Sequence, residues 1–173
     1  MKHALLSTTF AALLAAASAM AQSTAISSEY LMTLNLMKNP VVGVDATHAI
    51  SLETGGTVSG RVRGKIVAPS ADWVTVLPGD GLRAALDARV AIETDDHEII
   101  GMTYNGRFYC DPANADRYRK HELLHAGDCY IITAPTFQTK SEKYAWLNNV
   151  QAVGKMVEYV NADHLVYDLF VIK

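Results

Sequence analysis

The pattern with the most specific chemistry is His121-Glu122-Leu123-Leu124-His125. In zinc proteases, two histidines four residues apart lie on one helix face and bind the metal, and the glutamate between them activates the metal-bound water. The end of an amphipathic helix has the same pattern, with the two leucines packed inward and the histidines in solvent. Gly127 would stop such a helix at once, and no third ligand is evident in the sequence at a customary spacing. We therefore favour the helix end and keep a zinc-dependent hydrolase, acting through His121, Glu122 and His125, as the second alternative.

A second group of residues has the types that line a ligand pocket. Asp72 beside Trp73 would be a general base with a raised pKa if it were desolvated. The Arg89 guanidinium would bind a carboxylate or enolate oxygen with two hydrogen bonds. Aromatic walls with a few placed polar groups are typical of ligand cavities, and the candidates for these are Trp73, Tyr104, Tyr144, Trp146 and Asn148.

Each of these residues also has a structural interpretation. Arg89 with Asp87, two residues away, fits an ordinary surface ion pair. Asp72 fits a residue that shapes the turn before its strand, and the two tryptophans fit a core. Both interpretations stay open at the level of sequence.

The elements that must position these residues are mostly short strands. Turn signals separate runs of alternating polarity, which we assign to Tyr30–Met37, Val41–Leu52 (broken near Asp45), Thr57–Val67, Trp73–Leu77, Leu82–Thr94, Ile99–Tyr104, Tyr130–Thr133, Val150–Tyr159 and Leu165–Ile172. Thr54-Gly55-Gly56 is assigned to a turn, and residues 111–126 to one short helix laid across an opening. An all-β fold follows: a single antiparallel barrel of about nine to ten strands, since closure removes exposed edges. A sandwich is the alternative.

The run Leu82–Thr94 has two distinct faces. Leu86 and Val90 lie on its apolar face, and Asp87 and Arg89 on its polar face. Arg89 can anchor a ligand inside the barrel only if the polar face points inward. The ordinary arrangement puts Leu86 and Val90 inside and leaves Arg89 in solvent.

Several fragments in order resemble the uncharacterised family known as domain of unknown function 3237. They are Gly55-Gly56 with Gly60 and Gly64, Ala71-Asp72-Trp73, Leu86-Asp87-Ala88-Arg89, Glu93-Thr94-Asp95-Asp96, Thr133-Ala134-Pro135 with Phe137 and Thr139, and Tyr144-Ala145-Trp146-Leu147-Asn148. The likeness covers roughly Glu29 to Lys173 and implies a small β-barrel of lipocalin-like outline, with no assured activity. Ile132, Gln138 and His97 stand where the family usually has arginine, glutamate and glycine.

The N-terminus has the features of an export signal. Lys2 gives a charged start, an apolar run extends from Phe10 to Ala17, and Ala19-Met20-Ala21 is a small-x-small cleavage pattern. The apolar run is shorter than the ~20 residues that span a bilayer. We therefore expect residues 1–21 to be a signal peptide and residues 22–173 to be one domain, periplasmic or secreted and with no membrane contact after cleavage.

Cys110 and Cys129 are the two cysteines of the chain, and export makes a disulfide between them the expected state. Two free buried thiols are the alternative. The formal net charge of −3 argues against nucleic acid as the main partner.

These observations favour an exported barrel that binds a small apolar or aromatic molecule, with no cofactor implied. The first alternative is a cofactor-free lyase, isomerase or cyclase in the same pocket, with Asp72 as base and Arg89 as its partner. The sequence names neither the ligand nor the oligomeric state.

Overall fold

Alternating polarity produces long strands here, most of them longer than predicted. The computed structural model describes residues 25–173, so the predicted signal peptide and its cleavage site lie outside the described residues. The elements are β1 (Ser28–Lys38), β2 (Val42–Gly43), β3 (His48–Gly60), β4 (Gly64–Val76), β5 (Leu82–Thr94), β6 (Ile99–Cys110), α2 (Pro112–Arg119), β7 (Leu124–His125), β8 (Tyr130–Gln138), η1 (Ala145–Asn149), β9 (Ala152–Val160) and β10 (His164–Ile172).

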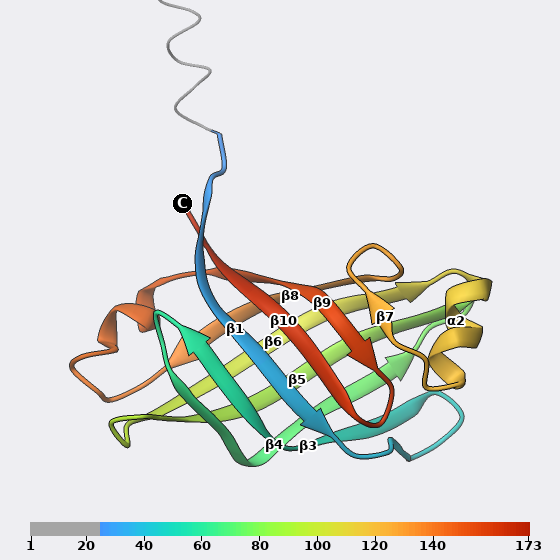
Figure 1. Cartoon of the computed structure of the whole chain (residues 1–173), viewed down its shortest axis with the longest axis horizontal. Helices are drawn as coiled ribbons and strands as arrows, with labels where there is room; N and C mark the ends of the chain where they lie inside the picture. Colours follow the sequence, from blue (N-terminus) through green and yellow to red (C-terminus); the bar gives the residue numbers. More distant parts are fainter. Residues whose placement is uncertain (1–24) are drawn as a thin grey trace, which may run out of the picture.

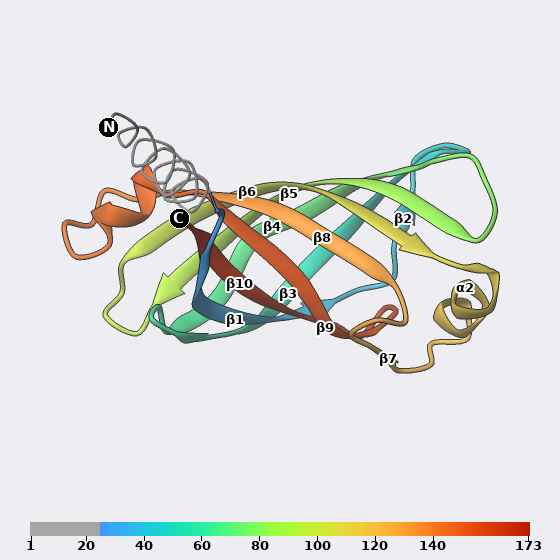
Figure 2. The ribbon, with the colours of Figure 1, turned by 90° about the horizontal axis from the view of Figure 1, so that it is seen from above.

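Eight long antiparallel strands close into a barrel. Their order is β1-β10-β9-β8-β6-β5-β4-β3, and β1 pairs with β3 to complete the ring. The short strands β2 and β7 add to β3 and β9 at the rim. Helix α2 lies at one end of the barrel and η1 at the other (Figures 1 and 2). The predicted all-β barrel with one short helix is thus confirmed.

The predicted strands are wrong at the seam where β3 pairs with β1 and closes the ring. Gly55 and Gly56 do not form a turn but lie inside β3, and the predicted strand 57–67 is broken between Gly60 and Gly64. Gly56 has a φ of 135°, and a Cβ there would overlap the carbonyl oxygen of Asn35 on β1. Glycine therefore permits close approach of two backbones at the position where the ring closes. On the other side of β1, Ser27 and Lys173 extend its pairing with β10 through two backbone hydrogen bonds of 3.0 and 2.9 Å.

The apolar face of β5 points into the barrel. Leu86 and Val90 are buried, whereas Arg89 between them is exposed, so the ordinary arrangement holds and the inward polar face is ruled out. Buried side chains of β1, β5, β6 and η1, among them Leu31, Ile92, Met102 and Leu147, fill the end near η1. The end near α2 is partly hollow.

Helix α2 begins as predicted but ends earlier. The carboxylate of Asp111 accepts a hydrogen bond from the backbone N–H of Asn114, and Pro112 opens the first turn. The helix ends at Arg119, and Leu124 is then fully buried in β7, which pairs with β9. Continuing the helix to residue 126 would withdraw Leu124 from that strand pairing. No helix within residues 25–173 is long and apolar enough to cross a membrane.

The predicted disulfide between Cys110 and Cys129 is present, with the two Cα atoms 4.5 Å apart. Cys110 ends β6, and Cys129 immediately precedes β8. The bridge therefore ties together the two ends of the segment 111–128, which carries α2. We call this segment the cap.

Candidate functional site

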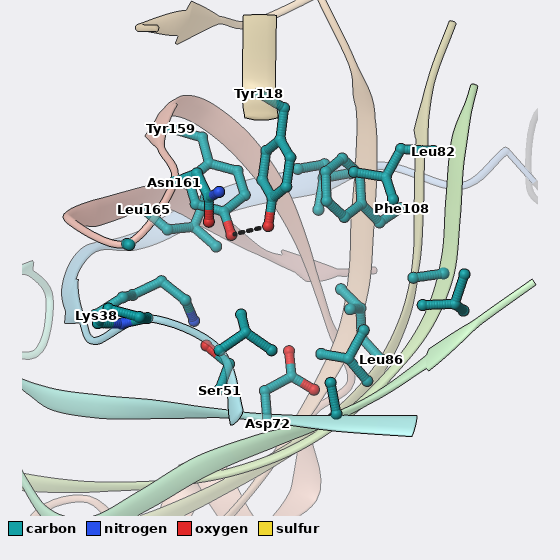
Figure 3. Close-up of a pocket in the computed structure, with 18 of the residues that line it drawn as sticks. Lys38, Ser51, Asp72, Leu82, Leu86, Phe108, Tyr118, Tyr159, Asn161 and Leu165 are labelled. Carbon is teal, nitrogen blue, oxygen red and sulfur yellow. Dashed lines mark hydrogen bonds between the residues drawn. The ribbon is translucent and has the colours of Figure 1, made fainter. Parts of the chain in front are cut away.

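The hollow end of the barrel holds a cavity of about 360 Å³ beneath the cap (Figure 3). This is within the size range of small-molecule sites. Its walls are mostly apolar and come from eight strands, the β1–β2 connection, the cap and the β9–β10 turn. The lining residues are Lys38, Pro40, Val41, Ala49, Ser51, Asp72, Val74, Val76, Leu82, Ala84, Leu86, Phe108, Tyr118, His121, Ile131, Tyr159, Asn161, Ala162, Leu165 and Tyr167.

Strand pairing places two polar side chains next to each other on the cavity floor. Ser51 on β3 and Asp72 on β4 are direct antiparallel partners, and both side chains point inward because both residues are buried. Directly opposed residues have Cβ atoms roughly 5 Å apart. In Figure 3 the Asp72 carboxyl group projects from the floor into the cavity.

Asp72 is 4% exposed and has an unusual protonation equilibrium. Burial raises its pKa to about 7; the Lys38 ammonium opposes this rise and the Glu53 carboxylate adds to it. One carboxylate oxygen accepts a 3.0 Å hydrogen bond from the backbone N–H of Asp87. A carboxyl group that titrates near neutrality inside a cavity can act as either acid or base at physiological pH.

Lys38 and Glu53 form a buried ion pair at the side of the cavity. The Lys38 Nζ donates to Glu53 Oε1 over 2.7 Å, and the two side chains are 4% and 0% exposed. The second carboxylate oxygen of Glu53 has no hydrogen-bond partner among the described residues. Lys38 lines the cavity and Glu53 lies behind it. The pair therefore brings polar, fully desolvated groups close to Asp72 without adding net charge.

Three buried hydroxyl groups in this region lack a hydrogen-bond partner within residues 25–173: those of Ser51, Tyr104 and Tyr167. Ser51 and Tyr167 line the cavity, whereas Tyr104 packs edge-on against Tyr167 with ring centroids 6.2 Å apart. Buried hydroxyl groups are normally satisfied, so each of these three is an exception that calls for an explanation.

The roof of the cavity is aromatic. Tyr118 of the cap and Tyr159 of β9 approach with their hydroxyl oxygens 3.4 Å apart, and both rings pack against Phe108 (Figure 3). Burial raises the pKa of both tyrosines. At the mouth, the His121 Nδ1 lies 2.7 Å from the backbone carbonyl oxygen of Asn161 in the β9–β10 turn. These contacts hold the cap over the cavity.

The structure does not bring Trp73 and Arg89 to Asp72. Asp72 pairs with Ala88 and Trp73 with Asp87 on β5, so successive residues point to opposite sides of the sheet. Trp73 is 47% exposed, and the Arg89 guanidinium lies outside the barrel, over the Trp73 ring and 3.2 Å from Asp87. Of these residues, only Asp72 reaches the cavity.

Tyr144, Trp146 and Asn148 lie at the opposite end of the barrel. The Tyr144 hydroxyl donates to Asp96 over 3.0 Å, and the guanidinium of Arg61 stacks on Trp146. Asn148 exchanges hydrogen bonds with the backbone of Thr139. These three residues close the η1 end and do not contact the cavity. The predicted convergence is therefore corrected: of the seven residues of the predicted pocket, only Asp72 lines the cavity, with Tyr104 behind it.

The histidine pair of residues 121–125 is not on a helix. His121 has a φ of 59° in the loop after α2, and His125 lies in β7. The shared helix face that the zinc-protease pattern requires is thus missing in this segment. Among residues 25–173, no group of three or more histidine, cysteine, aspartate or glutamate side chains is placed to hold a metal ion.

The polar cavity-end residues Lys38, Ser51, Glu53 and Tyr167 were not identified from the sequence, nor were the three aromatic residues of the roof. For Lys38 and Tyr167, the alternation of buried and exposed residues along the strand could have predicted an inward side chain. Lys38 is in register with the buried Leu34 and Leu36, and Tyr167 with Leu165 and Leu169. A charged or hydroxylated residue on the inward face of a barrel strand is a candidate site residue.

Comparison with known proteins gives a family and a fold. The model of a family described as "Protein of unknown function (DUF3237)" matches residues 26–172. A UPF0311 protein of Bradyrhizobium diazoefficiens is 28% identical over 149 residues, 83% of this chain and 95% of its own length.

Two solved structures are similar. A beta-barrel like protein of Acinetobacter baumannii has a TM-score of 0.71 and 28% identity, with 86% of this chain and 97% of that chain covered. An enzyme from Penicillium herquei has a TM-score of 0.61 and 26% identity, with 87% and 96% covered.

Proposed function

Because the chain belongs to the DUF3237 family, whose function is unknown, we propose its function from the barrel itself: it binds a small, largely apolar molecule in the cavity beneath the cap. The observation that carries this proposal is the cavity of about 360 Å³ with apolar walls and a few polar groups that converge on it. Such cavities are the usual form of small-molecule sites.

We also propose that the protein acts in the periplasm or outside the cell. Two features support this location. Residues 1–21 have the pattern of a cleavable signal, and the Cys110–Cys129 disulfide is of a kind that persists in oxidising compartments. N-terminal sequencing of the protein from its own cells tests the proposal, with Gln22 as the expected first residue. A cytoplasmic chain that begins at Met1 would contradict it.

A matched pair of substitutions on β5 tests ligand binding. Ala84 is buried and lines the cavity, and its neighbour Ala85 faces outward. Ala84→Phe should fill the cavity and abolish the fluorescence rise of N-phenyl-naphthylamine, a neutral apolar probe. Ala85→Phe should leave probe binding unchanged. Circular dichroism and thermal unfolding would verify that both variants fold, and equal probe binding by both would contradict the proposal.

A second function, cofactor-free proton transfer in the same cavity, is favoured by one observation. Burial raises the pKa of Asp72 to about 7, which suits a general acid or base at neutral pH. The similar solved structure from Penicillium herquei, 26% identical to this chain, is described as an enzyme. Native mass spectrometry of the protein from its own periplasm would identify the carried compound. Conversion of that compound by the wild type but not by Asp72→Asn would establish catalysis; binding without conversion by both would leave a binding protein.

A further inference from the structure

The chemical class of the ligand can be deduced from the polar groups around the cavity, if the proposed binding function holds. We infer that the ligand is a neutral molecule with a ring-bearing apolar body and one hydrogen-bond-accepting oxygen of carbonyl type, which binds to the hydroxyl groups of Ser51 and Tyr167.

The oxygen is inferred from the two unpartnered hydroxyl groups. Ser51 is 3% exposed and Tyr167 1% exposed, both line the cavity, and neither hydroxyl has a hydrogen-bond partner within the described chain. They come from β3 and β10, the two strands that flank β1. A buried hydroxyl without a partner loses free energy relative to water, and a ligand acceptor restores its hydrogen bond. A carbonyl oxygen has two lone pairs and can accept from both groups.

The neutral charge is inferred from the ionisable groups that surround these hydroxyls. The single ammonium, Lys38, is already paired with Glu53 over 2.7 Å. Asp72 is the cross-strand partner of Ser51, and burial raises its pKa, so this carboxyl group resists negative charge. A carboxylate ligand would add a negative charge to this desolvated group of acids, and the lining residues offer it no unpaired lysine or arginine. Fatty acids and other organic anions are therefore disfavoured.

The ring-bearing body is inferred from the roof and walls. Phe108, Tyr118 and Tyr159 present ring faces and edges above the polar floor, with centroid separations of 5.4 to 6.0 Å. Leu82, Leu86 and Ile131 complete the apolar wall. Aromatic side chains in such arrangements favour flat ring systems through edge and face contacts.

Three probes that share one skeleton test the inference: α-tetralone (the ketone), tetralin (the hydrocarbon) and tetralin carboxylate (the anion). Isothermal titration of the full-length mature protein, with its disulfide intact, should give the ketone an affinity about tenfold higher than the hydrocarbon, as expected for hydrogen bonds to otherwise unsatisfied groups. The carboxylate should bind more weakly than either.

A double variant identifies the groups that recognise the oxygen. Ser51→Ala with Tyr167→Phe should remove the advantage of the ketone and leave tetralin binding as it was. The control variant, Ser59→Ala with Tyr130→Phe, removes the same two kinds of hydroxyl from exposed positions and should keep the advantage.

Each other result has a distinct meaning. Equal affinities of the wild type for ketone and hydrocarbon would overturn the inferred ligand class and leave apolar binding intact. A preference for the carboxylate would overturn the neutral charge, and an unchanged preference in the double variant would overturn the role of the two hydroxyls. If none of the three probes binds, both this inference and the proposed function fail.

Discussion

Asp72 is held in the folded protein with a pKa near 7, whereas an unfolded aspartate titrates near 3.9. As pH rises from about 4 to about 7, the unfolded chain loses a proton that the folded protein keeps. The free energy of unfolding should therefore fall across this window and level off above it, because both states are then ionised. The total loss is on the order of 2–4 kcal/mol.

Asp72→Asn should remove this dependence, since an amide keeps the acceptor for the Asp87 N–H and carries no charge. Urea unfolding of both proteins between pH 4.5 and 8.5 measures the difference, with the exposed Asp87→Asn as control. If the wild type and Asp72→Asn follow parallel curves, Asp72 titrates normally and its proposed role as acid or base fails.

The ion pair between Lys38 and Glu53 predicts an asymmetric response to mutation. Lys38→Met leaves the Glu53 carboxylate buried without its ammonium and should lower the free energy of unfolding by about 3–5 kcal/mol. Lys38→Met together with Glu53→Met should recover most of this loss, because no unpaired charge remains.

The exposed ion pair between Lys173 and Glu29 serves as the reference. Lys173→Met should change the free energy of unfolding by no more than about 1 kcal/mol, since both side chains are in water. Denaturant titration of all the variants provides the comparison. A Lys38→Met protein as stable as Lys173→Met would show that Glu53 is protonated or solvated.

At the level of single residues, the sequence left Asp72 open between a desolvated acid and a turn residue, and it grouped Arg89 and Trp73 with it. A strand alternates strictly, so residues 72 and 73 must face opposite sides. The proposed anchor role of Arg89 required the polar face of β5 to point into the barrel. Leu86 and Val90 on the other face already favoured an apolar interior with Arg89 in solvent. The alternation predicted which side chains share a face; it did not predict which face surrounds the cavity.

The cap is the element whose position depends most on a covalent link. The disulfide closes a loop over a sequence separation of 19 residues between β6 and β8. Cys110→Ala with Cys129→Ala should lower the free energy of unfolding by about 3 kcal/mol. The cap should also become more susceptible to proteolysis, because its closure would then depend on noncovalent contacts, among them those of Tyr118, His121 and Leu124.

Reduction provides the control for this prediction. A reducing agent should destabilise the wild type to the level of the double variant and leave the variant itself unchanged. Denaturant titration and limited trypsin digestion under both conditions measure the two effects. If the oxidised wild type and the double variant unfold at the same denaturant concentration, the bridge does not constrain the cap.

At the level of elements, the strand ends were predicted correctly where the sequence has residues typical of turns. They were predicted wrongly where glycine lies inside a strand instead of in a turn. Pro78-Gly79-Asp80-Gly81 does separate β4 from β5, and the bounds of β5 agree with the prediction. Gly55 and Gly56 have turn chemistry too, but both lie inside β3, and Gly56 permits the close approach of β3 to β1. That approach is a long-range contact, so local sequence patterns cannot reveal it. The early end of α2 likewise depends on the pairing of β7 with β9.

At the level of the whole molecule, the barrel has a packed end and a hollow end. The packed end is closed by η1, where Tyr144 and Trp146 interact with Asp96 and Arg61. The hollow end carries the cavity, and the cap with α2 lies at this end (Figure 2). Aromatic residues that the sequence grouped as one pocket are divided between these ends, because strand order and stagger decide which segments meet. The sequence therefore predicted the barrel but not the location of its site.

The hydroxyls of Ser51 and Tyr167, unpartnered within residues 25–173, bear on how this protein can be engineered and how it can evolve. Each is buried without a hydrogen-bond partner among the described residues, so selection for heat resistance alone should favour apolar replacements at these two positions. Retention of both residues under such selection would need a benefit that only a bound molecule provides. A thermostability screen of random variants, followed by probe titration, would therefore map the proposed binding site without knowledge of the natural ligand. The site would consist of the positions where a substitution raises the melting temperature and lowers the affinity for the probe.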